Sequence, residues 1–274
     1  MARNLTNSAS DYIDCGNLTA MNNLTGFVLS AWINPKNQEF YVSRHNGSNH
    51  GFAMQYFHDS GVIPIGFYLN VTNNGTGNTG TWLITLTKWT HCTMFFDGTI
   101  GTASQRVKLY LDGVLQTPNT TQSWPSSLPS ITEEFLIGGL NGAGRTWNQM
   151  DYAKIKFWGV ALAVGEIKND SVGKVPRQES LIVNLPLDGY SPEPDYSGNG
   201  NNGTINGTIP VVDGPPVAEL FGYDESQMFA VGAAPPAATP AWARYGTYLK
   251  RRLLILSGLF RMAFAKLIPH APHP

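Results

Sequence analysis

The stretch of residues 88–116 constrains the fold more than any other part of this chain. Residues 89–96 are rich in aromatic and β-favouring side chains, and the Asp97-Gly98 pair that follows tolerates the positive φ angles of a tight turn. Residues 107–111 form a second apolar run, and Asp112-Gly113 supplies a second turn. The stretch therefore predicts a long hairpin of two antiparallel strands with their turns.

Further strand-like runs precede this hairpin, with polar turns between them at a spacing of about ten residues, which is typical of a sandwich or jelly roll. The runs are residues 27–33, 40–43, 51–57, 63–69 and 82–87. In the first run every second residue from Phe27 to Ile33 is apolar, so we expect this set to face the core.

Several of these motifs, taken in order, resemble laminin G-like domains of the concanavalin A-like jelly-roll type. They are D-Y-I-D at 11–14, L-S-A-W-I-N-P at 29–35, K-L-Y-L-D-G at 108–113, F-L-I-G-G at 135–139 and I-K-F-W at 155–158. The resemblance covers roughly residues 8–170. It implies an all-β fold, an antiparallel jelly-roll sandwich, closed by a strand at 155–158 and one short helix near 161–168.

A later segment adds a strand-like run at 179–187 and the sequence D-Y-S-G-N-G-N-N-G-T at 195–204. The second sequence resembles a turn that many laminin G-like domains carry before their opening strand. Here it follows the domain, so both a rearranged chain order and a final hairpin that completes one sheet fit it. We place the domain at residues 1–208, including this Gly/Asn-rich hairpin.

The C-terminal part differs in composition. Residues 209–239 are rich in Pro and Ala and predict an extended linker. Residues 240–268 predict a C-terminal amphipathic α-helix, because large apolar residues recur every three or four positions. These are Trp242, Tyr245, Leu249, Leu253, Leu256, Phe260, Phe264 and Leu267. Three partners fit such a stripe: a homo-oligomer or larger assembly, which we favour, the chain's own domain, or a membrane interface.

Charge and cysteine content exclude several classes of protein. Only 14% of the residues are charged and the net charge is −1, so no basic field is available to bind nucleic acid. Cys15 and Cys92 are too few for a disulfide framework, and we interpret them as buried apolar residues rather than as a bonded pair. No apolar signal segment precedes Asp11, which favours synthesis without a secretory leader.

Catalytic and metal-binding patterns are weak. Laminarinase-like enzymes of the same superfold carry E-x-D-x-x-E, and the nearest match here, Glu193-Pro194-Asp195, lacks the second glutamate. His45, His50 and His58 fall in adjacent loops, but their spacing follows no ligand rule. His91 is interpreted as a framework residue that bonds a neighbouring strand.

Two kinds of ligand remain as hypotheses. The resemblance implies that loops of this family can bind Ca²⁺, and Asp195, Asn199 and Asn201 carry suitable oxygens, although the same sequence is typical of a tight turn without an ion. We expect no other cofactor. Sugars stack on aromatic side chains in loops, and burial in the core is the alternative for each candidate. The candidates are Trp82, Trp124, Trp147, Tyr56 and Tyr68.

These features together predict a non-enzymatic structural or binding module on an assembly. Synthesis without a leader, a lectin-type domain and an apolar tail suggest a virion protein, such as a phage capsid decoration or fibre-associated subunit that self-associates through its tail and contacts surface glycans. The alternative is an extracellular or cell-surface carbohydrate-binding adhesin.

Overall fold

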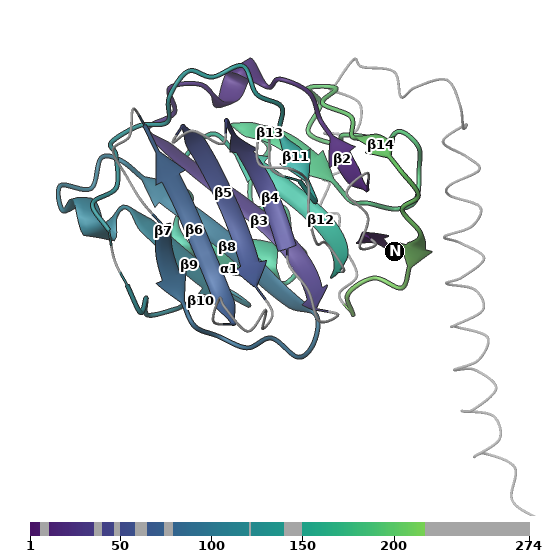
Figure 1. Cartoon of the computed structure of the whole chain (residues 1–274), viewed down its shortest axis with the longest axis horizontal. Coiled ribbons are helices and arrows are strands. Elements are labelled where there is room, and N and C mark those ends of the chain that lie inside the picture. The colour runs from purple at the N-terminus through teal and green to yellow at the C-terminus, as the bar shows by residue number, and fades with distance from the viewer. Residues whose placement is uncertain are drawn as a thin grey trace, which may run out of the picture. The chain divides into compact units, whose positions relative to one another are not determined.

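Two antiparallel β-sheets stack face to face in the described part of the chain (Figure 1). The computed structural model describes residues 1–5, 11–35, 40–46, 50–57, 65–73, 79–120, 122–139 and 150–216. These all belong to one unit, Met1–Asp224. Trp147, most of the predicted linker and the predicted helix at 240–268 lie outside the described residues.

Sheet A contains eight strands among the described residues, and the predicted central hairpin lies in it. Its order is β10 (Val114–Leu115), β9 (Val107–Leu111), β8 (Thr90–Asp97), β3 (Gly26–Pro35), β12 (Met150–Trp158), β1 (Ala2–Leu5) and β15 (Val211–Val212), with β13 (Leu181–Leu185) also paired to β12. The register joins Phe96 to Val107 and Cys92 to Leu111, which confirms the hairpin.

Sheet B contains seven strands among the described residues. Its order is β14 (Thr204–Asn206), β2 (Tyr12–Asp14), β11 (Leu136–Ile137), β4 (Phe40–His45), β5 (Gly51–Phe57), β6 (Gly66–Thr72) and β7 (Thr79–Trp82). The sequence prediction of a strand at 82–87 was wrong, because pairing with β6 joins Asn70 to Thr79 and ends with Phe67 opposite Trp82.

The main core lies between the sheets and follows the two-residue period of the strands. Phe27 and Ile33 at the ends of the predicted apolar set, and Leu29 and Ala31 between them, are all fully buried. The expectation for this strand is therefore confirmed. Cys15 and Cys92 are both buried and unpaired, which agrees with their interpretation as apolar core residues.

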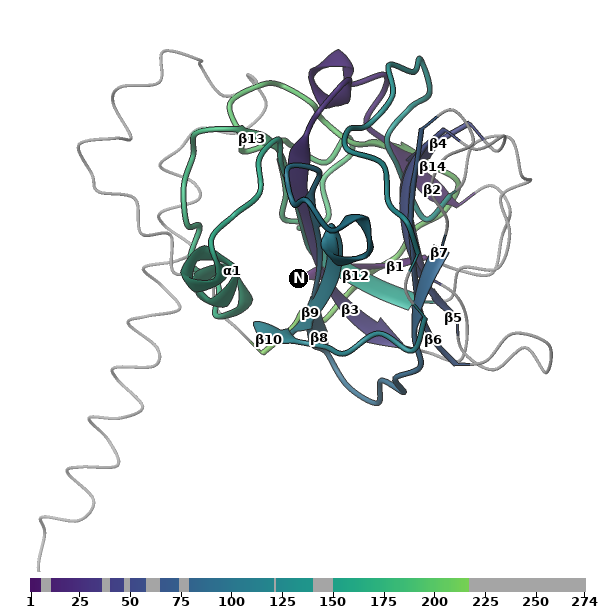
Figure 2. The same ribbon diagram turned by 90° about the vertical axis from the view of Figure 1, so that its left-hand side faces the viewer.

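Helix α1 (Val164–Ser171) covers the outer face of sheet A, on the side away from sheet B (Figure 2). A second apolar cluster lies under it, made of Val28, Phe95, Tyr110, Trp158, Leu162, Ile167 and Leu181. Asp170 of the helix accepts hydrogen bonds from Nε2 of His91 at 3.0 Å and from Nζ of Lys156 at 2.9 Å. All three side chains are sealed from solvent. His91 is thus a framework residue, but its partner lies on a helix rather than on a strand.

None of the helices in the described ranges is both long and apolar enough to cross a membrane. The remaining helical segments there are single 3₁₀ turns, η1 (Thr19–Met21) and η2 (Ala103–Gln105).

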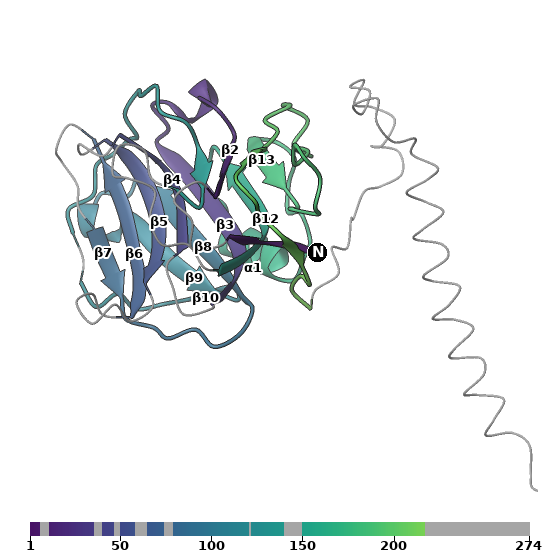
Figure 3. The ribbon, with the colours of Figure 1, turned by 45° about the vertical axis from the view of Figure 1, so that its right-hand side comes forward.

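The late segment returns to the N-terminus (Figure 3). Strand β1 lies between β12 and β15, and Arg3 in β1 donates to Glu193 Oε1 at 2.6 Å, to the Ile209 carbonyl at 2.7 Å and to the Tyr190 carbonyl at 2.6 Å. Strand β14 pairs with β2. A final hairpin therefore completes sheet B, and the fold extends beyond the predicted boundary at residue 208, because Ile209 is in the core and β15 belongs to sheet A.

The two Asp-Gly turns have different physical origins. Asp112 and Gly113 have φ angles of +48° and +76°, as predicted. Asp97 and Gly98 do not have positive φ angles. A side chain at position 98 would instead collide with the main-chain oxygen of Ser126, so close packing is what requires glycine there.

Candidate functional site

The Gly/Asn-rich segment folds around the carboxylate of Asp195. Main-chain hydrogen bonds of 2.8 Å in both directions between Glu193 and Gly203 close the loop. Four hydrogen bonds then converge on the carboxylate, from the main-chain N–H groups of Asn184, Ser197 and Asn201 and from the hydroxyl of Ser197, at 2.6–2.9 Å. These hydrogen bonds to the Asp195 carboxylate therefore fix the conformation of the loop.

Two asparagines of this loop attach it to the beginning of β13. Nδ2 of Asn199 donates to the Leu181 carbonyl at 2.8 Å, and Nδ2 of Asn201 donates to the Ile182 carbonyl at 2.7 Å. Because a side-chain amide is planar, fixing its nitrogen also fixes its oxygen. Each asparagine thus holds a hydrogen-bond acceptor in a defined position.

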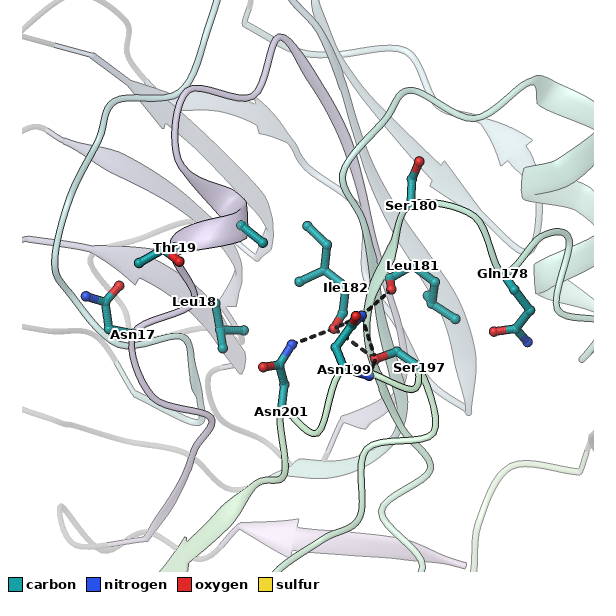
Figure 4. A pocket seen from close by; sticks show the side chains of 11 residues that line it. Asn17, Leu18, Thr19, Gln178, Ser180, Leu181, Ile182, Ser197, Asn199 and Asn201 are labelled. Atoms are coloured by element: carbon teal, nitrogen blue, oxygen red, sulfur yellow. Dashed lines mark hydrogen bonds between the residues drawn. The ribbon is translucent and has the colours of Figure 1, made fainter. Parts of the chain in front are cut away.

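A pocket of about 400 Å³ lies where this loop, the start of β13 and the segment at η1 meet (Figure 4). Its apolar lining includes the buried residues Leu18, Leu181 and Ile182. Its polar lining consists of amides and hydroxyls, from Asn17, Thr19, Gln178, Ser180, Ser197, Asn199 and Asn201. None of the residues that line it carries a charge. The pocket suits an uncharged ligand that forms many hydrogen bonds.

Arg44 binds Asn17, one of the residues that line the pocket. Its Nη2 donates to Asn17 Oδ1 at 2.9 Å, and its Nη1 donates to Asn22 Oδ1 at 2.8 Å. Its remaining described bonds go to main-chain carbonyls of Ile131 and Glu133. Burial lowers the pKa of Arg44, against the opposing charge of Glu133. We infer that Arg44 positions Asn17.

Three of the five predicted aromatic residues are buried in the core. Tyr56, Trp82 and Trp124 are 0%, 2% and 2% exposed and belong to the core, so a ligand cannot reach their faces. The segment around Trp124 is accordingly a packed part of the fold. Tyr68 is half-buried on the outer face of sheet B, with its ring edge-on to Phe57 at 4.9 Å between centroids.

The predicted calcium ligands do lie together, but they do not fit a calcium site. Ca²⁺ takes six to eight oxygen ligands and favours carboxylates. Both oxygens of Asp195 already accept two hydrogen bonds each, and Asn199 and Asn201 offer only neutral oxygens. Across the described ranges, no group of three His, Cys, Asp or Glu side chains is placed to hold a metal ion.

Of the three predicted loop histidines, His45 and His50 lie within the described residues. His45 Nε2 lies 3.4 Å from the hydroxyl of Thr72, and burial lowers its pKa, assisted by the nearby His50. His58 lies outside the described residues.

Two of the predicted site residues, Asn199 and Asn201, line the pocket. The motif at 195–204 pointed to Asn199 and Asn201, although for another ligand. It missed Thr19 and Gln178, because they come from segments that meet this loop only when β13 and η1 are in place. No local pattern around either residue could have revealed this.

Solved structures of related shape exist. A protein from Bacteroides ovatus, provisionally described as carbohydrate-binding, matches at 22% identity with a TM-score of 0.58, over 79% of this chain and 61% of that one. This chain therefore spans less than two thirds of that protein. A heptameric SAP-like pentraxin from Limulus polyphemus matches at 13% identity with a TM-score of 0.43, over 61% of this chain and 77% of that one. At 22% identity, the likeness to the Bacteroides ovatus protein shows the fold alone. No curated protein matches the chain.

The family of the chain is shown by its sequence rather than by these structural likenesses. Residues 7–168, more than half of the chain, match the family model described as the concanavalin A-like lectin/glucanases superfamily. The matched range contains the central hairpin and strand β12, which pairs with β1, β3 and β13 in sheet A. The chain belongs to the concanavalin A-like lectin/glucanases superfamily.

Proposed function

We propose that this domain binds carbohydrate in the pocket between the loop at 195–201, the start of β13 and η1. The observation that carries the proposal is the composition of the lining, which combines amides and hydroxyls with apolar residues and has no charged side chain. Sugars present many hydroxyl groups together with small apolar faces, so both parts of the lining have a counterpart on such a ligand. Membership of the superfamily and the provisional description of the Bacteroides ovatus protein support the same class of ligand.

We propose that binding is not coupled to hydrolysis. Hydrolysis of a glycoside requires two accessible carboxyl groups on opposite sides of the bond. Four carboxylates are buried in the described ranges. Asp151 is held by Asn4 and Asn34, Asp170 by His91 and Lys156, and Glu193 by Arg3. Asp11 accepts a hydrogen bond from the main-chain N–H of Thr208. The carboxylate of Asp195 is saturated by hydrogen bonds from its own loop and from Asn184 in β13.

A blocking substitution tests the pocket. Ala20 lines it and is exposed, so Ala20→Trp should fill the space without disturbing the core and should weaken glycan binding at least ~10-fold, about 1.4 kcal/mol. Binding would first be found on a glycan array and then measured by NMR titration. Val164→Trp, at an exposed position on α1 outside the pocket lining, is the matched control and should bind normally.

The same experiment can relocate the site. Tyr68→Ala removes the half-buried ring on the outer face of sheet B. Loss of binding in Tyr68→Ala with normal binding in Ala20→Trp would move the ligand to that face. An array without any binding would refute the proposed function.

We also propose that residues 240–268 attach the domain to an assembly. The support is the apolar stripe in their sequence, which would contribute on the order of 10 kcal/mol if eight or more large side chains were buried. A virion surface, as a capsid decoration or fibre-associated subunit, fits such display. A cell-surface adhesin is the alternative.

Removing residues 217–274 tests this attachment. We expect the full chain to sediment as an oligomer or to co-purify with partner proteins, because the apolar stripe requires burial. The shortened chain should be a monomer that retains glycan binding. A full-length chain that is monomeric by analytical ultracentrifugation, at the same concentration and without partners, would contradict the assembly role.

A further inference from the structure

We infer that the pocket selects neutral glycans and rejects acidic ones; this rests on the proposed function. The inference begins with Asn199 and Asn201, whose nitrogens are both used to bind main-chain carbonyls. The side-chain oxygens are left as acceptors, and no described protein group donates to either. In Figure 4 the oxygen of Asn201 points toward Leu18 across the pocket.

Two fixed acceptors require donors on the ligand. Sugar hydroxyls can donate to these oxygens. Deprotonated carboxylates, sulfates and phosphates cannot, since they only accept. The hydroxyls of Thr19 and Ser180 and the amide of Gln178 can either donate or accept, so they adapt to the remaining groups of a neutral sugar.

An acidic sugar would also lose solvation without compensation. Desolvating an anion is costly unless a cation or several donors replace the water, and none of the lining residues is cationic. Arg44 binds a lining residue, but it is 1% exposed and its N–H groups already donate to Asn17, Asn22 and two main-chain carbonyls. Selection therefore works through repulsion by the fixed oxygens as well as through attraction of hydroxyls.

Matched pairs of ligands test the selectivity. Each neutral oligosaccharide is paired with its C6-carboxylate form, for example galactotriose with trigalacturonate and cellotriose with its uronate, and binding to the full chain is measured by NMR titration. The neutral member should bind at least ~10-fold more tightly than the acidic one. Its affinity should change less than ~2-fold between 0.05 and 0.5 M NaCl, because no charge pair contributes.

A single substitution should reverse the discrimination. Gln178 is exposed and none of its side-chain atoms bonds a described residue, so Gln178→Lys places a cation at the rim without cost to the fold. We expect acidic ligands to bind at least ~5-fold more tightly to this variant, with a gain that disappears in 0.5 M NaCl. Gln178→Met, which is similar in length and uncharged, should show no such gain.

The outcomes separate the two proposals. If the wild-type protein binds the acidic member as tightly as the neutral one, the neutral selectivity is refuted while carbohydrate binding stands. If the Gln178→Lys variant gains nothing, the rim is not in contact with the ligand and the inference fails. If neither member of any pair binds, the proposed function itself fails.

Discussion

Replacing Asp170 by asparagine is expected to lower the free energy of unfolding by about 3–5 kcal/mol, the range for a broken buried ion pair. Asp170 accepts hydrogen bonds from both Lys156 and His91 under α1, and all three groups are about 1% exposed. Asparagine has nearly the same shape, so the apolar packing under the helix is kept. What is lost is the charge that compensates the ammonium group of Lys156.

The same carboxylate should make the protein sensitive to acid. Burial alone would raise the pKa of Asp170, but Lys156 and His91 outweigh it, so the pKa lies well below its ordinary range. A depressed carboxyl pKa stabilises the fold fully above the unfolded value of about 3.9, and this contribution is lost as pH falls toward the folded value. Urea denaturation between pH 7 and pH 2 should show this loss in the wild-type protein and a smaller one in Asp170→Asn.

Asp213→Asn is the matched control, because Asp213 is exposed, and it should change stability by less than about 0.5 kcal/mol. Equal stability of Asp170→Asn and the control would show that the ions under α1 do not hold the helix. An identical acid dependence in the wild-type and Asp170→Asn proteins would assign the acid sensitivity to other carboxylates.

The fold was largely predictable because its strands carry local signals. The strand from Phe27 to Ile33 and the turn at Asp112-Gly113 can each be predicted from a pattern only a few residues long. The same is not true of β1, which was not predicted. Its sequence, Ala2 to Leu5, has no β signature, and it is held in the sheet by β12 and β15, which lie far along the chain.

The aromatic side chains were the least predictable part of the site. A Pro, Ser and Thr-rich connector is typical of a surface loop, so its tryptophan was predicted to be accessible to a ligand. Trp124 is instead buried, because its ring fills the space beside Gly80. The composition of a segment does not determine whether its side chains are buried, because burial depends on which other segments cover it. The pocket has the same origin, since three segments distant in sequence build it.

Replacing Arg3 by methionine should destabilise the protein by about 3–5 kcal/mol and should weaken glycan binding as well. Arg3 compensates Glu193, which is 0% exposed, and Glu193 begins the hairpin that carries the pocket loop. Methionine keeps most of the side-chain volume. It removes the charge and the bonds to the carbonyls of Tyr190 and Ile209. Chemical denaturation and the NMR titration measure the two effects.

This loss of stability should fade in acid, as the loss in Asp170→Asn also does, but for a different reason. Burial raises the pKa of Glu193, and Arg3 opposes the rise, so without Arg3 the pKa should rise further. A carboxyl whose folded pKa exceeds its unfolded value of about 4.3 destabilises the fold at neutral pH, and this penalty fades as pH falls through the folded value. Arg3→Met should therefore approach wild-type stability in acid, and adding Glu193→Gln should recover part of the loss at pH 7.

The chain offers a second Arg–Glu pair as the control. Arg177 and Glu166 are 37% and 20% exposed, so Arg177→Met should cost less than about 1 kcal/mol. If both methionine variants cost the same, burial is not what makes the Arg3–Glu193 pair important. If the Arg3→Met loss does not depend on pH, an uncompensated Glu193 is not its cause. A destabilisation of several kcal/mol that fades in acid, seen for Arg3 alone, would show that a single buried ion pair joins the first strand of the chain to the loop that builds the pocket.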